Sequence, residues 1–122
     1  MSYFVALLLL AGSYLTPQQV VWVYAVEAGI DPVRAVATVQ AESGFDQWAV
    51  GDNGHAAGWW QFHASPETWE TWQWAVGITG APAEWSDPAW RFDPVASTIV
   101  ATRLIGMGYG YMWTGWRMAG GP

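Results

Sequence analysis

The chain has 122 residues, of which 52 % are hydrophobic, so it is long enough for one domain with a modest core. Ten acidic residues against four arginines and no lysine give a net charge of −6, which argues against nucleic-acid binding because no basic stripe exists. The absence of cysteine excludes disulfides and thiolate metal sites. Eleven tryptophans are unusual: some must be buried, and others are candidates for a sugar or lipid surface.

Residues 1–15 differ from the rest because they form a compact apolar run without a charged side chain. The stretch 3–10, followed by small residues at 11–13, resembles a secretory signal, although no lysine or arginine precedes Arg34. It is short for a transmembrane helix, which needs about 20 apolar residues. Three alternatives stay open: a signal peptide or short anchor, a buried N-terminal helix, or an interfacial segment. We expect an exported or membrane-associated protein, with residues 1–15 as the candidate membrane contact and residues 16–122 as the main domain.

Helix-start signals recur along the chain as a capping side chain followed by proline, which is tolerated at the first helical position. These pairs are Thr16-Pro17, Asp31-Pro32, Ser65-Pro66 and Asp93-Pro94. Gln19 completes a capping box with Thr16, and Gly29 is a helix stop. They predict helices over 17–28, 32–43, 66–76 and 94–106, while Asp87-Pro88 predicts only a turn. Alternating strand patterns are lacking, so we expect a mainly α fold with a tiny hairpin in the glycine-rich loop.

Glu42 is the first candidate for chemistry. Ala35, Val39 and Glu42 are spaced at i, i+4 and i+7, so they share one face of the helix predicted over 32–43. The carboxyl therefore extends an apolar stripe, where desolvation favours the protonated form that a general acid needs. The alternative is an exposed, inert glutamate at a helix end.

The stretch 44–64 is the longest connection and carries glycines that permit positive φ at 51, 54 and 58. Next to them, Trp59, Trp60 and Phe62 provide flat apolar surfaces beside Gln61, whose amide both donates and accepts hydrogen bonds. This combination is suited to the C–H face and the hydroxyls of a sugar. The alternative for the two tryptophans is that one of them is simply core.

The order of these motifs resembles the signature of the lysozyme-like lytic transglycosylases, a Glu-Ser pair, then Ala-Val, then Gly-x-x-Gln. The matching segments run from Ala41 to Phe45, from Trp48 to Val50 and from Ala57 to Gln61. The resemblance covers roughly residues 16–106 and implies cleavage of the β-1,4 bond between N-acetylmuramic acid and N-acetylglucosamine in peptidoglycan. It implies that Glu42 is the catalytic acid/base and that Ser43, Gly58 and Gln61 shape the glycan subsite.

The chain departs from that family near its end. The family has a Tyr-Asn-x-Gly motif whose tyrosine faces the cleft, and here the segment 108–116 offers Tyr109 or Tyr111 instead. The tryptophans Trp113 and Trp116 are more similar to phage and actinobacterial relatives, which would allow a virion-associated protein. The missing motif also keeps open a non-catalytic glycan-binding or virion-structural protein, and a small membrane-associated lysis protein is a third alternative.

Asp52 is the residue that bears on whether the expected reaction is transglycosylation or hydrolysis. A transglycosylase needs one carboxylate because the sugar's own 6-hydroxyl closes onto the anomeric carbon, whereas a hydrolase needs a second group for water. Asp52 lies nine residues before Gln61, a spacing similar to that of an acidic residue in goose-type lysozymes, and His63 stands near another acidic position of those enzymes. The alternative for Asp52 is a turn residue in Gly-Asp-Asn-Gly. His55 and His63 form no zinc-binding pattern, so we expect no metal and no cofactor.

Overall fold

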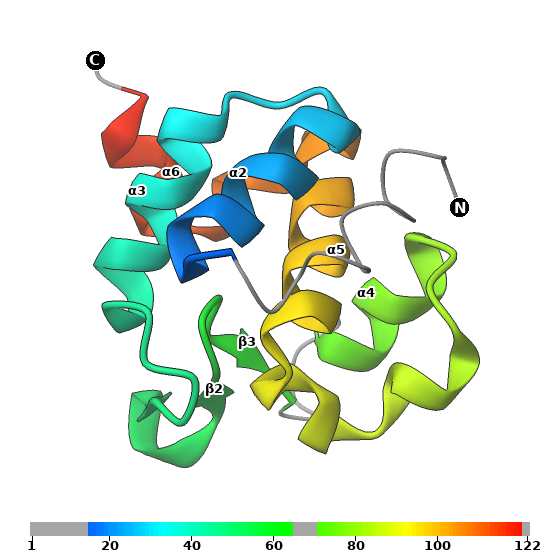
Figure 1. Ribbon diagram of the computed structural model, residues 1–122. Coiled ribbons are helices and arrows are strands. Elements are labelled where there is room, and N and C mark those ends of the chain that lie inside the picture. The colour runs from blue at the N-terminus through cyan, green and yellow to red at the C-terminus, as the bar shows by residue number, and fades with distance from the viewer. Residues whose placement is uncertain (1–14, 65–70, 121–122) are drawn as a thin grey trace.

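The computed structural model describes residues 15–64 and 71–120, which contain five α-helices and a three-stranded antiparallel sheet (Figure 1). The helices are α2 (Pro17–Ala28), α3 (Pro32–Ser43), α4 (Trp72–Ile78), α5 (Pro94–Leu104) and α6 (Thr114–Ala119). The strands are β1 (Val50–Gly51), β2 (Ala56–Ala57) and β3 (Phe62–His63). The prediction of a mainly α domain with a small hairpin in the glycine-rich loop is confirmed.

The first two described helices begin and end at the predicted residues because their caps are local. The Thr16 hydroxyl accepts the Gln19 N–H, and the Gln19 side chain accepts the Thr16 N–H, so the capping box before α2 is complete. Gly29 ends α2 in the left-handed conformation at φ 76°. The carboxylate of Asp31 then accepts backbone N–H groups at the start of α3.

Later helices depart further from the prediction. Asp93 caps α5 as expected, but α5 ends two residues before the predicted boundary, where the chain widens into a looser turn over Ile105–Tyr109. The Asp87-Pro88 pair opens a 3₁₀ turn over Pro88–Phe92. The helix expected over 66–76 is α4 from Trp72 onward, and its Ser65-Pro66 start lies outside the described residues, as does the segment 1–14.

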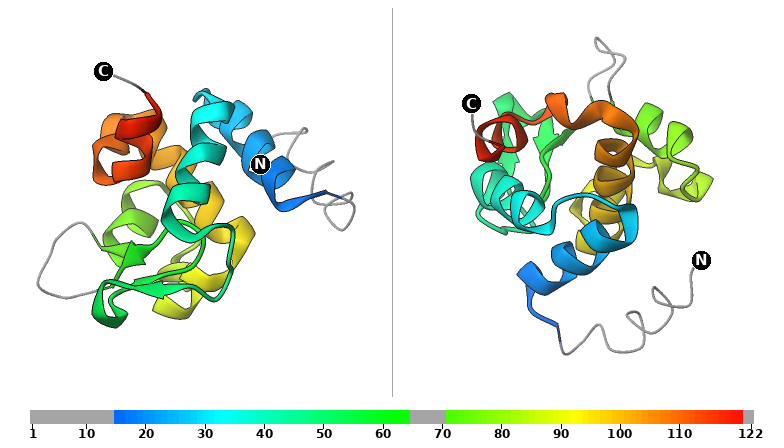
Figure 2. Two further views of the ribbon diagram at one scale, coloured as in Figure 1. Left: turned by 90° about the vertical axis from the view of Figure 1, so that its left-hand side faces the viewer. Right: turned by 90° about the horizontal axis from the view of Figure 1, so that it is seen from above.

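The core lies between helices that are distant in sequence. Helix α3 packs against α2 and α6, while α5 packs against α2 and α4. Figures 1 and 2 show α6 alongside α3 on one side of the molecule and α4 on the other. The sheet lies beyond the carboxyl end of α3 (Figure 2). The bulkiest fully buried apolar side chains are Trp60, Trp72, Leu104, Val21, Val39, Val76 and Val100.

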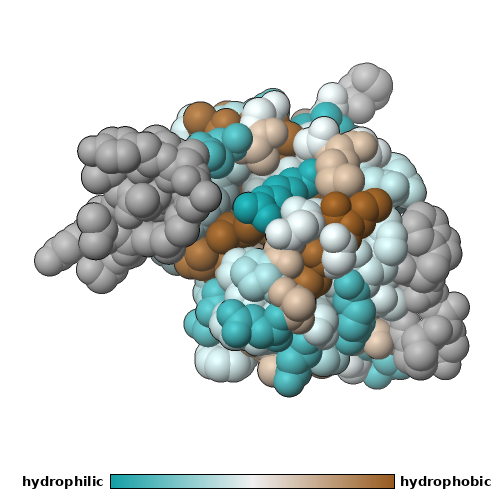
Figure 3. Space-filling model, turned by 90° about the vertical axis from the view of Figure 1, so that its right-hand side faces the viewer, coloured by the Kyte–Doolittle hydropathy of each residue, from teal (hydrophilic) through white to brown (hydrophobic). Residues whose placement is uncertain are grey.

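The described surface is mixed in character. On the face in Figure 3, hydrophobic residues occur as separate patches between hydrophilic ones. Large apolar side chains that remain exposed include Trp22 at 45 % and Trp48 at 68 %. Among the helices within 15–64 and 71–120, none has the length and apolar character needed to span a membrane.

Candidate functional site

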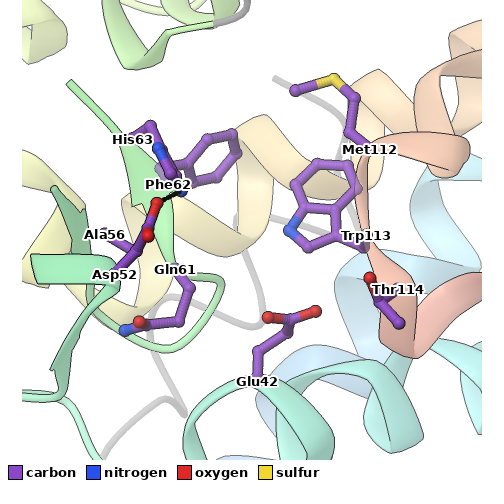
Figure 4. Close-up of a pocket in the computed structure, with 9 residues that line it drawn as sticks. All are labelled: Glu42, Asp52, Ala56, Gln61, Phe62, His63, Met112, Trp113 and Thr114. Atoms are coloured by element: carbon purple, nitrogen blue, oxygen red, sulfur yellow. Dashed lines mark ion pairs between the residues drawn. The ribbon is translucent and has the colours of Figure 1, made fainter. Parts of the chain in front are cut away.

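The sequence candidates Glu42 and Asp52 line the same cavity, which has a volume of about 460 Å³. Figure 4 shows Glu42 rising from the helix side, with Asp52 and His63 on the sheet side. Three segments contribute to the wall: the end of α3, the three-stranded sheet with its turns, and the chain just before and at the start of α6. The lining residues are Glu42, Asp52, Ala56, Gln61, Phe62, His63, Met112, Trp113 and Thr114.

Glu42 is placed by the register of α3. Ala35 and Val39 on the same face are fully buried, so the helix is held against the core and its last turn points Glu42 toward the cavity. The Glu42 side chain is half-buried, and its Oε1 accepts a long hydrogen bond of 3.4 Å from the Gly115 N–H of α6. Helix α3 ends directly afterwards at Gly44, which has a φ of 61°. One carboxyl is therefore held in a partly desolvated wall with a donor on one oxygen.

Helix α6 reaches α3 because residue 115 is glycine. A Cβ at Gly115 would lie 3.1 Å from the Ala41 Cβ and 3.2 Å from the Cα and carbonyl oxygen of Thr38, so a side chain here would require these atoms to move by a few tenths of an ångström. Arg34 of α3 fastens the same contact: its Nε donates to the Trp116 carbonyl at 2.7 Å, and its guanidinium lies 4.1 Å from the centre of the Trp116 ring. This close packing brings residues 112–114 to the cavity.

Trp113, which lines the cavity, connects the segment before α6 with the loop that carries Trp60 and Phe62. Its Nε1 donates to the Trp60 carbonyl at 2.8 Å. Its ring makes edge-to-face contacts with Trp60 at 5.7 Å and with Phe62 at 5.4 Å between ring centres. Phe62 and Trp113 are only 3 % and 4 % exposed, so these rings close the wall of the cavity and offer little open surface.

Asp52 and His63 form an ion-pair contact on the sheet side of the cavity. The His63 Nε2 lies 3.3 Å from the Asp52 Oδ2, with the two side chains 38 % and 60 % exposed (Figure 4). Asp52 has a positive φ of 50°, and Asn53 follows at 56°. Aspartate and asparagine tolerate this region better than other non-glycine residues, so the turn aims the carboxylate at the imidazole without glycine.

Gln61 braces the glycine-rich loop. Its Nε2 donates to the Gly58 carbonyl at 2.9 Å and to the Ala49 carbonyl at 3.1 Å, so both amide hydrogens are used inside the protein. Gln61 has a positive φ of 51°. Both donor hydrogens of this amide therefore hold the loop, while the side chain still lines the cavity.

Ser43 and Gly58 also hold the loop in place, and neither lines the cavity. The Ser43 hydroxyl donates to the Trp59 carbonyl at 2.8 Å, which ties the end of α3 to the loop. At Gly58, with φ 79°, an added Cβ would lie 2.0 Å from the Arg91 carbonyl oxygen, so only glycine allows this approach.

Arg91 is a supporting residue that sequence reasoning missed. Its Nη1 donates to the carbonyls of His55 and Phe62, both at 2.9 Å, and its Nε donates to the Pro88 carbonyl at 2.8 Å. Burial lowers the pKa of the Arg91 guanidinium, although arginine remains protonated in proteins. The cation thus fastens β3, which carries His63, to the turn before α5.

The remaining aromatic candidates lie outside the cavity lining. Trp60 is 0 % exposed and Trp59 is 5 % exposed, so their rings belong to the core rather than to a sugar-binding surface. Tyr109 packs edge-on against Trp74 at 5.0 Å, and Tyr111 is 49 % exposed. Residues 112–114 line the cavity instead. The sequence gives no capping residue followed by proline at this segment, so its position was not predicted.

No protein-family model matches this chain, and the comparisons with curated proteins and with solved structures found no match either. The resemblance of the Glu-Ser and Gly-x-x-Gln segments to the transglycosylases therefore remains an interpretation of the sequence. Within residues 15–64 and 71–120, no three histidine, aspartate or glutamate side chains are grouped closely enough to hold a metal ion.

Proposed function

We propose that the protein cleaves the β-1,4 bond between N-acetylmuramic acid and N-acetylglucosamine in peptidoglycan, as a lytic transglycosylase. The observation that carries the proposal is Glu42, a half-buried carboxyl on the wall of a cavity that also has the aromatic side chains Phe62 and Trp113. A carboxyl in partly apolar surroundings is the group that protonates a glycosidic oxygen. The activity requires access to the cell wall, by export or by delivery in a virion.

The reaction needs one carboxyl acting twice. The protonated Glu42 gives its proton to the leaving glycosidic oxygen as the bond to the anomeric carbon breaks. The resulting carboxylate then takes the proton of the 6-hydroxyl of the same muramic acid, whose oxygen bonds to the anomeric carbon. The product is a 1,6-anhydro sugar, and Glu42 is again protonated. The Gly115 N–H on Oε1 stabilises the carboxylate between the two steps and keeps the side chain oriented.

Hydrolysis is a second candidate because of one specific observation, the Asp52–His63 contact on the opposite side of the cavity from Glu42 (Figure 4). Such a pair can accept the proton of a water whose oxygen bonds to the anomeric carbon. Glu42 would serve as the acid for the leaving oxygen in the same way. The two reactions differ in the product by one water.

The test is mass spectrometry of soluble fragments after purified peptidoglycan is incubated with the wild type, Glu42→Gln or Asp52→Asn. We expect anhydro-muropeptides from the wild type and at least about 100-fold less product from Glu42→Gln, with a free energy of unfolding within about 1 kcal/mol of the wild type. Glu27→Gln, at an exposed position of α2, is the matched control and should retain full activity.

Each other outcome assigns a different function. Products with a free reducing end, reduced in Asp52→Asn, would indicate hydrolysis. Undiminished fragments from Glu42→Gln would refute the assignment of the acid. Binding of peptidoglycan without release of fragments by the wild type would make the protein a glycan-binding module.

A further inference from the structure

A second cavity of about 410 Å³ lies apart from the first and shares none of its lining residues. It is formed between the loop after α3 and the turn before α5, two segments more than 40 residues apart in sequence. Three of its lining side chains are aromatic. The lining residues are Gln47, Trp48, Ala89, Trp90, Phe92 and Asp93.

Trp48 is the aromatic side chain that stands out at this cavity. It is 68 % exposed, although tryptophan gains more from burial than most side chains. Its ring lies 5.7 Å from the ring of Phe92 with only 31° between the planes, so Phe92 supports it. Its backbone is held as well, because the Trp48 N–H donates to the Asp46 carboxylate at 2.9 Å. The result is a flat apolar surface that is open to solvent and already ordered.

Polar groups adjoin this aromatic surface. Gln47 contributes an amide that can donate and accept, and Asp93 contributes a carboxylate, one oxygen of which caps α5 through the Ala96 N–H at 2.9 Å. The six lining residues include this one acid and no lysine or arginine. An aromatic plane beside hydrogen-bonding groups is suited to a neutral sugar ring, and a lining with a negative charge alone disfavours an anionic ligand.

The second cavity is mechanically connected to the first. Ala49, next to Trp48, accepts hydrogen bonds through its carbonyl from the Gly58 N–H at 2.9 Å and from the Gln61 side chain at 3.1 Å. Gly58 in turn packs against the backbone of Arg91 and Phe92. One hydrogen-bonded unit thus carries Gln61 at the first cavity and Trp48 at the second.

We propose that Trp48 and Phe92, with Gln47 and Asp93, form a second carbohydrate-binding site, which holds a pyranose ring of a glycan strand away from the cavity of Glu42. The ring stacks on the exposed face of Trp48, and its hydroxyls pair with Gln47 and Asp93. This inference rests on the proposed function for the choice of an N-acetylated glycan as the ligand. The site increases the residence time of the protein on its substrate without taking part in the chemistry.

The probe is the chitin oligosaccharide tetra-N-acetylchitotetraose, titrated into the Glu42→Gln variant so that nothing is cleaved. Indole N–H resonances are followed by NMR, and the Trp48 signal is assigned by its loss in Glu42→Gln/Trp48→Ala. Sedimentation with insoluble peptidoglycan measures affinity for the polymer. Trp48→Phe keeps an aromatic face, and Trp22→Ala removes a tryptophan that is 45 % exposed on α2, away from both cavities.

We expect the Trp48 indole signal to shift on titration and Trp48→Ala to bind peptidoglycan about tenfold more weakly. Trp48→Phe should retain most of the affinity, and Trp22→Ala should retain all of it. An unmoved Trp48 signal, or equal binding by Trp48→Ala, would overturn the inference. Fragment release is scored on the wild type with Glu42 intact. A shifting Trp48 signal together with no fragments from the wild type would refute the proposed function alone, whereas fragments from the wild type together with an unmoved signal would refute the second site alone.

Discussion

Replacement of Gly58 by alanine tests whether the loop is held against the turn before α5 in the way described. Two costs add at this position. The φ of 79° is a left-handed conformation that disfavours a residue with a Cβ by about 1–2 kcal/mol. The new Cβ would also lie 2.0 Å from the Arg91 carbonyl oxygen and 3.0 Å from the carbonyl carbon, and backbone atoms cannot rotate away. Such overpacking costs about 1–3 kcal/mol, so the sum is about 2–5 kcal/mol.

Gly54→Ala is the matched control for this prediction. Gly54 has a φ of 90° in the same loop, but an added Cβ would meet no atom within 4 Å. This variant should therefore lose only the conformational part, about 1–2 kcal/mol. The difference between the two variants isolates the contact with Arg91.

Urea denaturation followed by tryptophan fluorescence measures both free energies of unfolding. Gly58→Ala should also lose the proposed peptidoglycan cleavage, because β3, which carries Phe62 and His63, is fastened to the turn by Arg91. Equal stability of Gly58→Ala and Gly54→Ala would refute the reasoning, since it would mean that the loop and the turn are not in contact.

Two further variants test the core. Trp60→Ala should lower the free energy of unfolding by about 3–5 kcal/mol, because the ring is 0 % exposed and its Nε1 donates to the Thr98 hydroxyl at 3.0 Å. Urea denaturation measures this free energy, and an unchanged value would contradict the assignment of Trp60 to the core. Tyr24→Phe concerns pH dependence: burial, and then the charge of Asp93, raise the pKa of the Tyr24 hydroxyl above its usual value of 10.0. The contribution of this group to the free energy of unfolding is fully present below pH 10 and is lost as the pH rises through the raised pKa. The free energy of unfolding of Tyr24→Phe should therefore fall less steeply than that of the wild type when both are measured between pH 8 and 11. Because this hydroxyl has no hydrogen-bond partner within the described part of the chain, the variant should keep its stability at pH 8; a large loss there would reveal a missed partner.

The helix starts were predictable because capping is local. The capping side chains accept hydrogen bonds from backbone N–H groups no more than three residues away, so neighbours in sequence are enough to specify each helix start. These are the side chains of Thr16 and Gln19 before α2, Asp31 before α3 and Asp93 before α5. Helix α6 shows the opposite case. Trp113 precedes it without a capping side chain, and the helix is held by its contacts with α3, in which Gly115 and Arg34 take part. Contacts of this kind leave no periodic or capping signal in a sequence.

The candidate site was predictable in part for the same reason. The position of Glu42 follows from helical spacing. The glycines at 51, 54 and 58 indicated a loop whose backbone can approach other segments closely. Burial could not be read from residue type, because the tryptophans of the single connection 44–64 range from the buried Trp60 to the exposed Trp48. Tyr109 and Tyr111 were expected near the cavity, but residues 112–114 line it instead, because the packing of α6 against α3 brings that segment there.

The amino-acid sequence alone determined the helical class, the starts of α2, α3 and α5 and the single carboxyl at the end of α3, since each depends on atoms only a few residues apart. Only the tertiary structure decided which side chains meet across the cavity, because the Gly115 N–H on Glu42 and the Asp52–His63 contact join residues distant in the chain. Their distances are set by how α6 and the small sheet pack against α3. That packing is a balance of many buried contacts, and no short segment of the sequence contains it.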